Sequence, residues 1–273
     1  MPNALTSKAL ASWALASCAL ASWALASRPA VMASRVVPAS ASAANRRDRP
    51  DAMTHPPHPV VTRDTILCEG RPVTIERFAP HGKDAPATAT VILLHDAEGP
   101  GSDRPVRAEA AALAEAGFAV LLPHYLDRTG EARVGFSGIS RHFGAWRDAL
   151  ETVRAQVPGP VALVGRSLGG ALALALAARA PGANAALVLR ATFLPPELGT
   201  GPLALPPALA LHGARDALVG PSHPETLRRR MEEAGGTCRV HLYPDQGHAF
   251  DPATDADATA RGVGFLKRAF GPI

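Results

Sequence analysis

The chain has 273 residues, 47% of them hydrophobic, which allows one large domain or two small ones and argues against a wholly disordered protein. The formal net charge of +4 lies entirely in residues 1–59, where six basic and two acidic side chains occur. The remaining residues balance 22 basic against 22 acidic side chains, and this balance predicts no nucleic-acid partner.

Residues 1–59 are predicted to form a low-complexity arm and linker, and residues 60–273 the folded domain. Residues 9–28 are four copies of one repeat, ALASW, ALASC, ALASW and ALASR. At about 100° per residue, a five-residue period brings no two successive copies onto one helix face. The following SAANRRDRPDAMTHPPHP is rich in small, charged and proline residues, as is typical of flexible linkers.

Three interpretations of the arm stay open. Lys8 and the apolar run after it resemble an export signal, and Leu15 to Cys18 loosely resembles a lipoprotein cleavage site. Alternatively, the arm is an over-extended translation of repetitive DNA, with Met53 as the working start, which the strict repeat favours. We therefore expect a cytoplasmic protein, with export as the alternative. Alanine contributes little to membrane insertion, so we expect no stable transmembrane anchor.

From residue 60 onward, short apolar runs alternate with longer amphipathic stretches. Strands at 62–69 and 73–79 are predicted to form a hairpin. Alternating strands and helices predict an α/β fold with a mostly parallel, doubly wound sheet, helices on both faces, and its chemistry at the carboxyl ends of the strands. The further strands are predicted at 89–94, 118–122, 160–164, 185–189, 208–211 and 239–243, and the helices at 104–116, 139–156, 168–180, 224–234 and 253–270.

A G-x-S-x-G motif, Gly165 to Gly169, places Ser167 between a predicted strand and a predicted helix. A sharp turn there projects the serine hydroxyl above the sheet, and the glycines remove the Cβ atoms that would collide. A glycine-rich turn that merely packs is the alternative interpretation. The motif GxxxxGK[ST] is absent, which disfavours a phosphate-binding loop.

A serine nucleophile needs a general base and a carboxylate that orients the base. In hydrolases with this turn the chain order is Ser, Asp or Glu, then His. Asp216 and His248 both follow predicted strands in that order. Asp245 is a rival for the carboxylate, and a helix-capping role is the alternative for Asp216. We expect His212 to support the loop that carries Asp216.

The backbone N–H groups of Ala97 and Leu168 are the predicted oxyanion donors. Leu168 opens the helix after Ser167, where N–H groups are unpaired and the helix dipole is positive. Ala97 lies in the loop after the first parallel strand. We expect His95 to brace this loop by hydrogen bonding and not to act as a base.

Five stretches, LLHDAEG, VLLPHYLDR, VGRSLGG, LHGARDALV and YPDQGHAF, resemble the dienelactone hydrolase family of α/β-hydrolases. The resemblance implies a single compact domain in which Asp216 and His248 serve the nucleophile. It also implies that Asp96 lies near the nucleophile, where the family tends to have Glu. Two positions depart from the family: Ser167 replaces the cysteine of its founding enzymes, and Pro252 replaces an arginine that binds the substrate carboxylate.

These features predict a serine hydrolase acting on small esters, lactones or thioesters, with no cofactor and no metal. Asp96, Tyr125 and Arg166 are the predicted substrate-binding residues, with a solvent-facing or salt-bridged side chain as the alternative for Arg166. The short, proline-rich segment 190–207 predicts an open site without a large lid. A peptidase or acyltransferase of the same fold, or a non-catalytic binding protein, are the alternatives. The cysteines Cys18, Cys68 and Cys238 are too far apart in sequence for a metal or redox motif.

Overall fold

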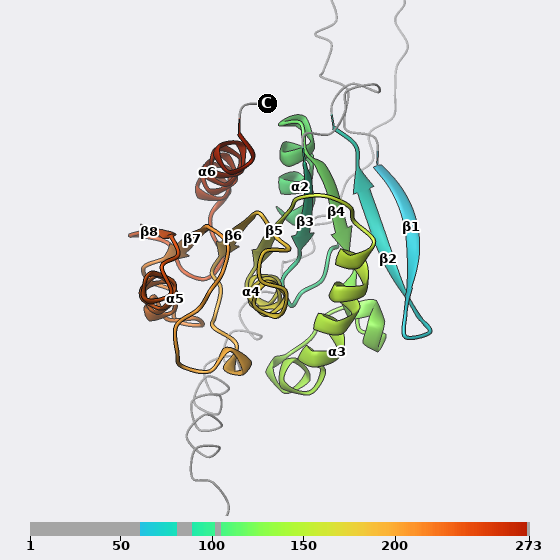
Figure 1. Ribbon diagram of the computed structural model, residues 1–273, viewed down its shortest axis with the longest axis horizontal. Coiled ribbons are helices and arrows are strands. Elements are labelled where there is room, and N and C mark those ends of the chain that lie inside the picture. The colour runs from blue at the N-terminus through green and yellow to red at the C-terminus, as the bar shows by residue number, and fades with distance from the viewer. Residues whose placement is uncertain (1–60, 81–88, 102–104, 272–273) are drawn as a thin grey trace, which may run out of the picture. The chain divides into compact units, whose positions relative to one another are not determined.

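A computed structural model describes residues 61–80, 89–101 and 105–271. The predicted arm, residues 1–59, lies outside the described residues, and so do Met53 and Cys18. The described part is built on an eight-stranded sheet with the strand order β1-β2-β4-β3-β5-β6-β7-β8. Figure 1 labels its elements.

After the opening hairpin, strands and helices largely alternate along the chain, as the sequence pattern predicts. The strands are β1 (Val61–Cys68), β2 (Arg71–Phe78), β3 (Thr90–Leu94), β4 (Ala119–Pro123), β5 (Val161–Arg166), β6 (Ala186–Arg190), β7 (Ala208–Gly213) and β8 (Cys238–Tyr243). The helices are α2 (Pro105–Glu115), α3 (Phe136–Ala155), α4 (Leu168–Arg179), α5 (Ser222–Glu233) and α6 (Pro252–Phe270), with short 3₁₀ turns η1 (Tyr125–Thr129) and η2 (Pro196–Leu198).

The sheet is parallel from β4 to β8 in its spatial order, whereas β1 and β2 pair as an antiparallel hairpin and β2 pairs antiparallel with β4. This confirms the predicted α/β fold with a mostly parallel sheet. Because parallel strands end at the same edge, the loops after β3, β5, β7 and β8 converge there.

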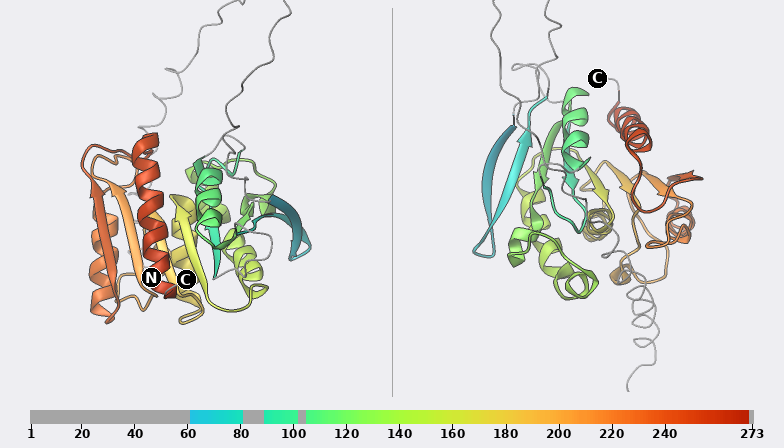
Figure 2. Two further views of the ribbon diagram at one scale, coloured as in Figure 1. Left: turned by 90° about the horizontal axis from the view of Figure 1, so that it is seen from above. Right: turned by 180° about the vertical axis from the view of Figure 1, so that it is seen from behind.

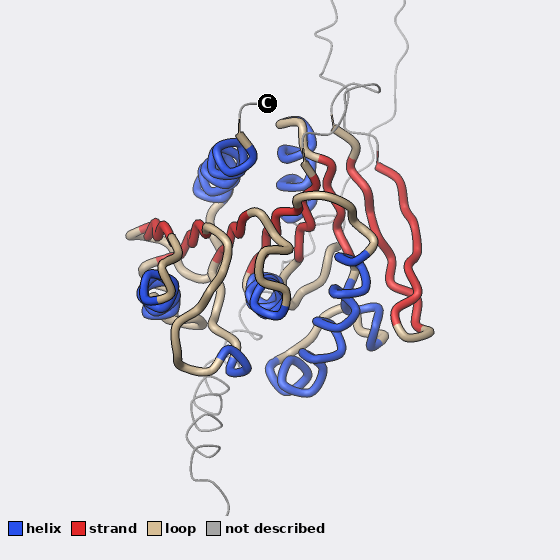
Figure 3. The backbone as a smooth tube through the Cα atoms, in the orientation of Figure 1, coloured by secondary structure: helices blue, strands red, loops and turns tan. Residues whose placement is uncertain are grey.

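Helices cover both faces of the sheet. α2 and α6 lie over one face, and α3, α4 and α5 lie over the other (Figures 1 and 2). The strands form a continuous layer between these two groups of helices (Figure 3). Under α2 and α6, the strand residues Leu93, Leu122 and Leu211 pack with Leu113 and Leu266 of the two helices. On the opposite side α4 is buried almost throughout, which explains its alanine-leucine composition.

The ends of some helices and strands differ from the predictions at positions where no buried apolar residue marks the end of the element. The hairpin turn consists of Glu69 and Gly70 alone, at φ 47° and 77°, so β2 includes Pro72, which was predicted to lie in the turn. Helix α3 begins at Phe136, three residues before the predicted start at Ile139. The sequence pattern placed the start at Ile139 because this is the first buried residue of the helix. A periodic apolar signal starts at the first buried side chain, not at the first helical one.

Two of the three cysteines lie in the described residues, and both are buried free thiols. Burial raises the pKa of the Cys238 thiol to about 12, and burial likewise raises the pKa of the Cys68 thiol. Neither is therefore a nucleophile at neutral pH. Across the described ranges, no helix is both long enough and apolar enough to cross a bilayer.

Candidate active site

Ser167 occupies a strained turn between β5 and α4. Its backbone has φ 48° and ψ −113°, and its N–H donates to the carbonyl of Arg190 at 2.8 Å. A Cβ atom at Gly165 would lie 2.5 Å from the Gly169 carbonyl oxygen, and one at Gly169 would lie 2.3 Å from the Leu94 carbonyl oxygen. Only glycine fits at either position, so the motif's glycines are required for this turn.

The structure brings Ser167, His248 and Asp216 into one chain of hydrogen bonds. His248 Nε2 lies 3.0 Å from Ser167 Oγ, and His248 Nδ1 lies 2.8 Å from Asp216 Oδ2. An ionised carboxylate only accepts, so Nδ1 carries the proton and Nε2 can accept from the serine hydroxyl. The rival carboxylate, Asp245, is largely exposed and pairs with Arg215.

Asp216 is buried and held in its ionised form. Its Oδ1 accepts from the backbone N–H groups of Leu218 at 2.9 Å and Val219 at 2.8 Å. Burial would raise the pKa of Asp216, but hydrogen bonds from His212, His248 and the Val219 N–H outweigh it and hold this pKa well below its usual range. His212 Nε2 lies 2.8 Å from the Val219 carbonyl oxygen, so His212 supports the loop that carries Asp216.

The residues predicted to supply oxyanion donors lie at the ends of two neighbouring strands. Leu168 is the first residue of α4, so its N–H has no acceptor within the helix. Ala97 lies in the loop after β3, which pairs directly with β5. Gly169 packs closely against the carbonyl groups of Leu94 and His95, so the start of α4 contacts the start of this loop.

His95 and Tyr125 form a buried support under the loop after β3. His95 Nδ1 lies 2.7 Å from the Asp96 carbonyl oxygen, and its ring stacks on Tyr125 at 4.1 Å. Burial lowers the pKa of His95 to about 3, so its ring stays neutral and donates from Nδ1. Tyr125 is fully buried and donates its hydroxyl to the His95 carbonyl at 2.8 Å. The prediction that Tyr125 binds substrate is therefore wrong.

A pocket of about 170 Å³ opens at Ser167. Asp96 lies in its wall, as predicted, and its carboxylate accepts from the Glu98 N–H at 2.9 Å. This volume is below the range of about 300–1,000 Å³ that is typical of pockets for drug-sized ligands. The pocket is lined by Asp96, Pro105, Arg166, Ser167, Arg190, Ala191, His248, Ala249, Phe250 and Asp255.

Two arginines at the pocket wall belong to a buried ionic cluster. Arg166 donates to Glu109 at 2.6 Å and to both Asp255 oxygens at 2.9 Å. Arg190 donates to Glu109 at 2.6 Å and to Asp255 at 2.9 Å. We call Arg166, Arg190, Glu109 and Asp255 the quartet. Its two positive and two negative charges balance, so Arg166 is salt-bridged at the pocket wall, which is the alternative that the sequence left open for this residue.

The quartet joins three segments that surround Ser167. Arg166 precedes Ser167, Glu109 belongs to the helix that follows the Ala97 loop, and Asp255 belongs to the helix that follows the His248 loop. Sequence reasoning missed Glu109, Arg190 and Asp255. The available signal was a charged residue inside an apolar pattern, since Arg190 ends the buried strand ALVLR and Glu109 lies on the apolar face of α2.

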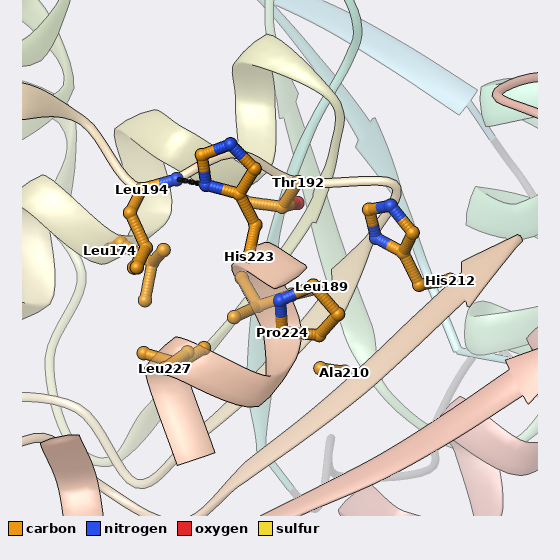
Figure 4. Close-up of a pocket in the computed structure, with 9 residues that line it drawn as sticks. All are labelled: Leu174, Leu189, Thr192, Leu194, Ala210, His212, His223, Pro224 and Leu227. Carbon is orange, nitrogen blue, oxygen red and sulfur yellow. Dashed lines mark hydrogen bonds between the residues drawn. The ribbon is translucent and has the colours of Figure 1, made fainter. Parts of the chain in front are cut away.

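A second, much smaller cavity of about 10 Å³ lies between β6, β7 and α5. His223 and Leu194 both line it and lie side by side (Figure 4), and His223 Nδ1 accepts from the Leu194 N–H at 3.1 Å. Burial lowers the pKa of His223, and the nearby His212 lowers it further. The cavity is too small for a substrate, and His223 fixes the segment after β6.

Comparison with known proteins adds a family and several structures. The sequence model of the dienelactone hydrolase family matches residues 78–262. A dienelactone hydrolase-like promiscuous phosphotriesterase from metagenomic libraries is 23% identical, with a TM-score of 0.66, covering 79% of this chain and 100% of that one. A dienelactone hydrolase from Anabaena variabilis is 20% identical, with a TM-score of 0.60, covering 77% and 98%.

Similarity extends to further solved structures, among them esterase PE8, which is 21% identical, with a TM-score of 0.55, covering 71% of this chain and 97% of that one. Est1E from Butyrivibrio proteoclasticus is 15% identical, with a TM-score of 0.61, covering 76% of this chain and 98% of that one. None of the curated proteins compared with the chain matches it. At these identities the solved structures show a shared fold.

The buried His95 predicts a specific loss of stability in acid. Because its pKa is about 3 in the folded protein and about 6.5 when unfolded, only the unfolded state gains a proton between these values. The contribution of the neutral, buried His95 to the free energy of unfolding is complete above about pH 6.5 and declines as the pH falls toward 3. Between pH 7.5 and pH 4.5, the free energy of unfolding measured in urea should fall more for the wild type than for His95→Gln, because the glutamine does not titrate. Equal losses would contradict this account.

The quartet predicts a large cost for removing one charge. Glu109→Gln leaves two buried arginines sharing one carboxylate, and we expect the free energy of unfolding to fall by about 3 kcal/mol. Glu233→Gln is the matched control, since Glu233 pairs with Arg229 on an exposed face and should change stability little. Urea unfolding of the two variants measures the difference. Similar losses would show that the quartet adds no stability beyond a surface pair.

Proposed function

Because the chain belongs to the dienelactone hydrolase family and is an ester-hydrolysing enzyme of the α/β-hydrolase fold, we propose that it is a serine hydrolase that works through a covalent acyl-enzyme. Its substrates are small esters, lactones or thioesters. The observation that carries the proposal is the hydrogen-bonded chain from Ser167 Oγ through His248 to Asp216. This is the arrangement that a serine needs to become a nucleophile.

In the first half of the reaction, Ser167 Oγ attacks the carbonyl carbon of the substrate. The hydroxyl proton passes to His248 Nε2 as the new carbon–oxygen bond forms. The ionised Asp216 keeps the proton of His248 on Nδ1 and stabilises the imidazolium that results. His248 then gives its proton to the leaving oxygen or sulfur, the bond to the leaving group breaks, and the acyl group stays on Ser167.

Negative charge on the carbonyl oxygen is stabilised by the backbone N–H groups of Ala97 and Leu168. The positive end of the α4 dipole adds to this stabilisation because Leu168 opens that helix. Removing one donor of this kind typically costs about 10² to 10³ in rate.

In the second half, water replaces the leaving group. His248 Nε2 takes a proton from the water, whose oxygen attacks the acyl carbon, and the same imidazolium returns the proton to Ser167 Oγ as the acid is released. Every step uses only the three side chains and the two backbone donors.

The charges at the pocket support a neutral substrate. Both arginines that line the pocket, Arg166 and Arg190, are paired with Glu109 and Asp255. Pro252 stands where the family's carboxylate-binding arginine is expected. Because neither arginine is left free to pair with a substrate carboxylate, we favour an uncharged ester over a dienelactone carboxylate.

Removing the nucleophile should abolish turnover. We expect Ser167→Ala to lower kcat for p-nitrophenyl acetate by roughly 10⁴-fold or more, because no hydroxyl remains to accept the acyl group. A fluorophosphonate probe should label the wild type and not the variant, and circular dichroism should be the same for both. A wild type that neither reacts with the probe nor hydrolyses esters would instead favour a non-catalytic binding protein.

Replacing each of the two candidate carboxylates by asparagine should show which of them serves His248. Asp216→Asn removes the acceptor that fixes the His248 tautomer, and we expect kcat to fall by about 10³ to 10⁴. Asp245→Asn is the matched control, because Asp245 is exposed and pairs with Arg215, and kcat should stay near the wild-type value. Steady-state kinetics on p-nitrophenyl acetate compares them. A large loss for Asp245→Asn and none for Asp216→Asn would reverse the assignment.

A further inference from the structure

A groove of about 480 Å³ lies between α2 and α6 and shares part of its wall with the pocket at Ser167. Both helices lie over the same face of the sheet (Figures 1 and 2). Pro105, Phe250 and Asp255 line both the groove and the pocket, so the two spaces adjoin. A substrate whose reacting carbonyl lies at Ser167 can therefore extend between the two helices.

Small, apolar side chains form the walls of the groove. Ala108 and Ala112 of α2 face it from one side, and Ala256 and Ala260 of α6 face it from the other. Each pair is four residues apart and so lies on one face of its helix, where the short side chains leave room. Pro252, Phe250 and Val263 complete the apolar lining.

The polar residues of the groove already have partners. Glu109 and Asp255 bind the guanidinium groups of Arg166 and Arg190, and the Thr259 hydroxyl accepts from Arg190 at 2.9 Å. Desolvating further polar groups of a ligand here would cost free energy without new hydrogen bonds from these side chains. The lining therefore favours an uncharged, apolar occupant.

We propose that this groove binds a straight alkyl chain of the ester substrate. The proposal rests on the esterase function and adds the substrate class. The lining of α2 runs from Pro105 to Ala112, about 10 Å along the helix, which matches an extended chain of roughly eight carbons. The chain belongs to either the acyl or the alcohol part of the ester, and burying it excludes water from the mouth of the pocket.

Two substrate series test the proposal on the full chain. One is p-nitrophenyl esters from acetate to octanoate, and the other is alkyl acetates from ethyl to octyl. We expect kcat/KM to rise roughly fourfold per added methylene in one series until the groove is filled. The series that responds identifies the acyl or the alcohol side as the chain in the groove. A flat response in both series overturns the proposal.

A large side chain that fills the groove should remove the preference for longer alkyl chains. In Ala260→Phe, the ratio of kcat/KM for the longest to the shortest member of the responding series should fall toward one. Ala269→Phe is the matched control, because Ala269 is exposed on the same helix outside the groove, and it should keep the wild-type ratio. A wild-type ratio in Ala260→Phe overturns the proposal.

A binding measurement separates failure of this inference from failure of the esterase assignment. Calorimetric titration with 1-octanol should show binding to wild type and to Ser167→Ala, and none to Ala260→Phe. If no ester is hydrolysed but 1-octanol binds in this pattern, the groove stands and the esterase assignment fails. If esters are hydrolysed but 1-octanol does not bind, the groove assignment fails alone.

Discussion

The backbone turn at Ser167 is the constraint on which the rest of the site depends. A non-glycine residue at φ 48° costs free energy, and the surrounding contacts must hold it. Close packing of Gly165 and Gly169 and the hydrogen bond from the Ser167 N–H to Arg190 supply these contacts. The turn aims the hydroxyl at His248 and the first N–H groups of α4 at the same space. One local conformation thus sets the position of both the proposed nucleophile and a proposed oxyanion donor.

Charged groups beneath the site hold the loops around this turn. The quartet links the residue before Ser167 to α2 and to α6, and these helices follow the loops that carry Ala97 and His248. Asp216 is held separately by backbone N–H groups and by His212. Buried polar contacts between groups of opposite charge therefore hold the segments around the site.

Much of the fold and the residues of the hydrogen-bonded chain could be predicted from the sequence. Each of Ser167, Asp216 and His248 follows a strand of the parallel part of the sheet, and parallel strands end at one edge, so topology brings these residues together. Ends of helices were less predictable, because α3 begins before its first buried side chain. The quartet could not be predicted, since its members come from four elements and only packing shows which charges meet. Tyr125 was misassigned because loop position does not reveal burial.

In the proposed mechanism, the acyl group of the substrate is transferred to Ser167 Oγ. Rapid mixing of the full chain with p-nitrophenyl acetate, acid quenching within the first turnover, and peptide mass spectrometry test this directly. We expect a burst of p-nitrophenol and a single acetyl group on the peptide that contains Ser167. Hydrolysis without an acetylated peptide, or with the acetyl group on a different residue, would contradict it.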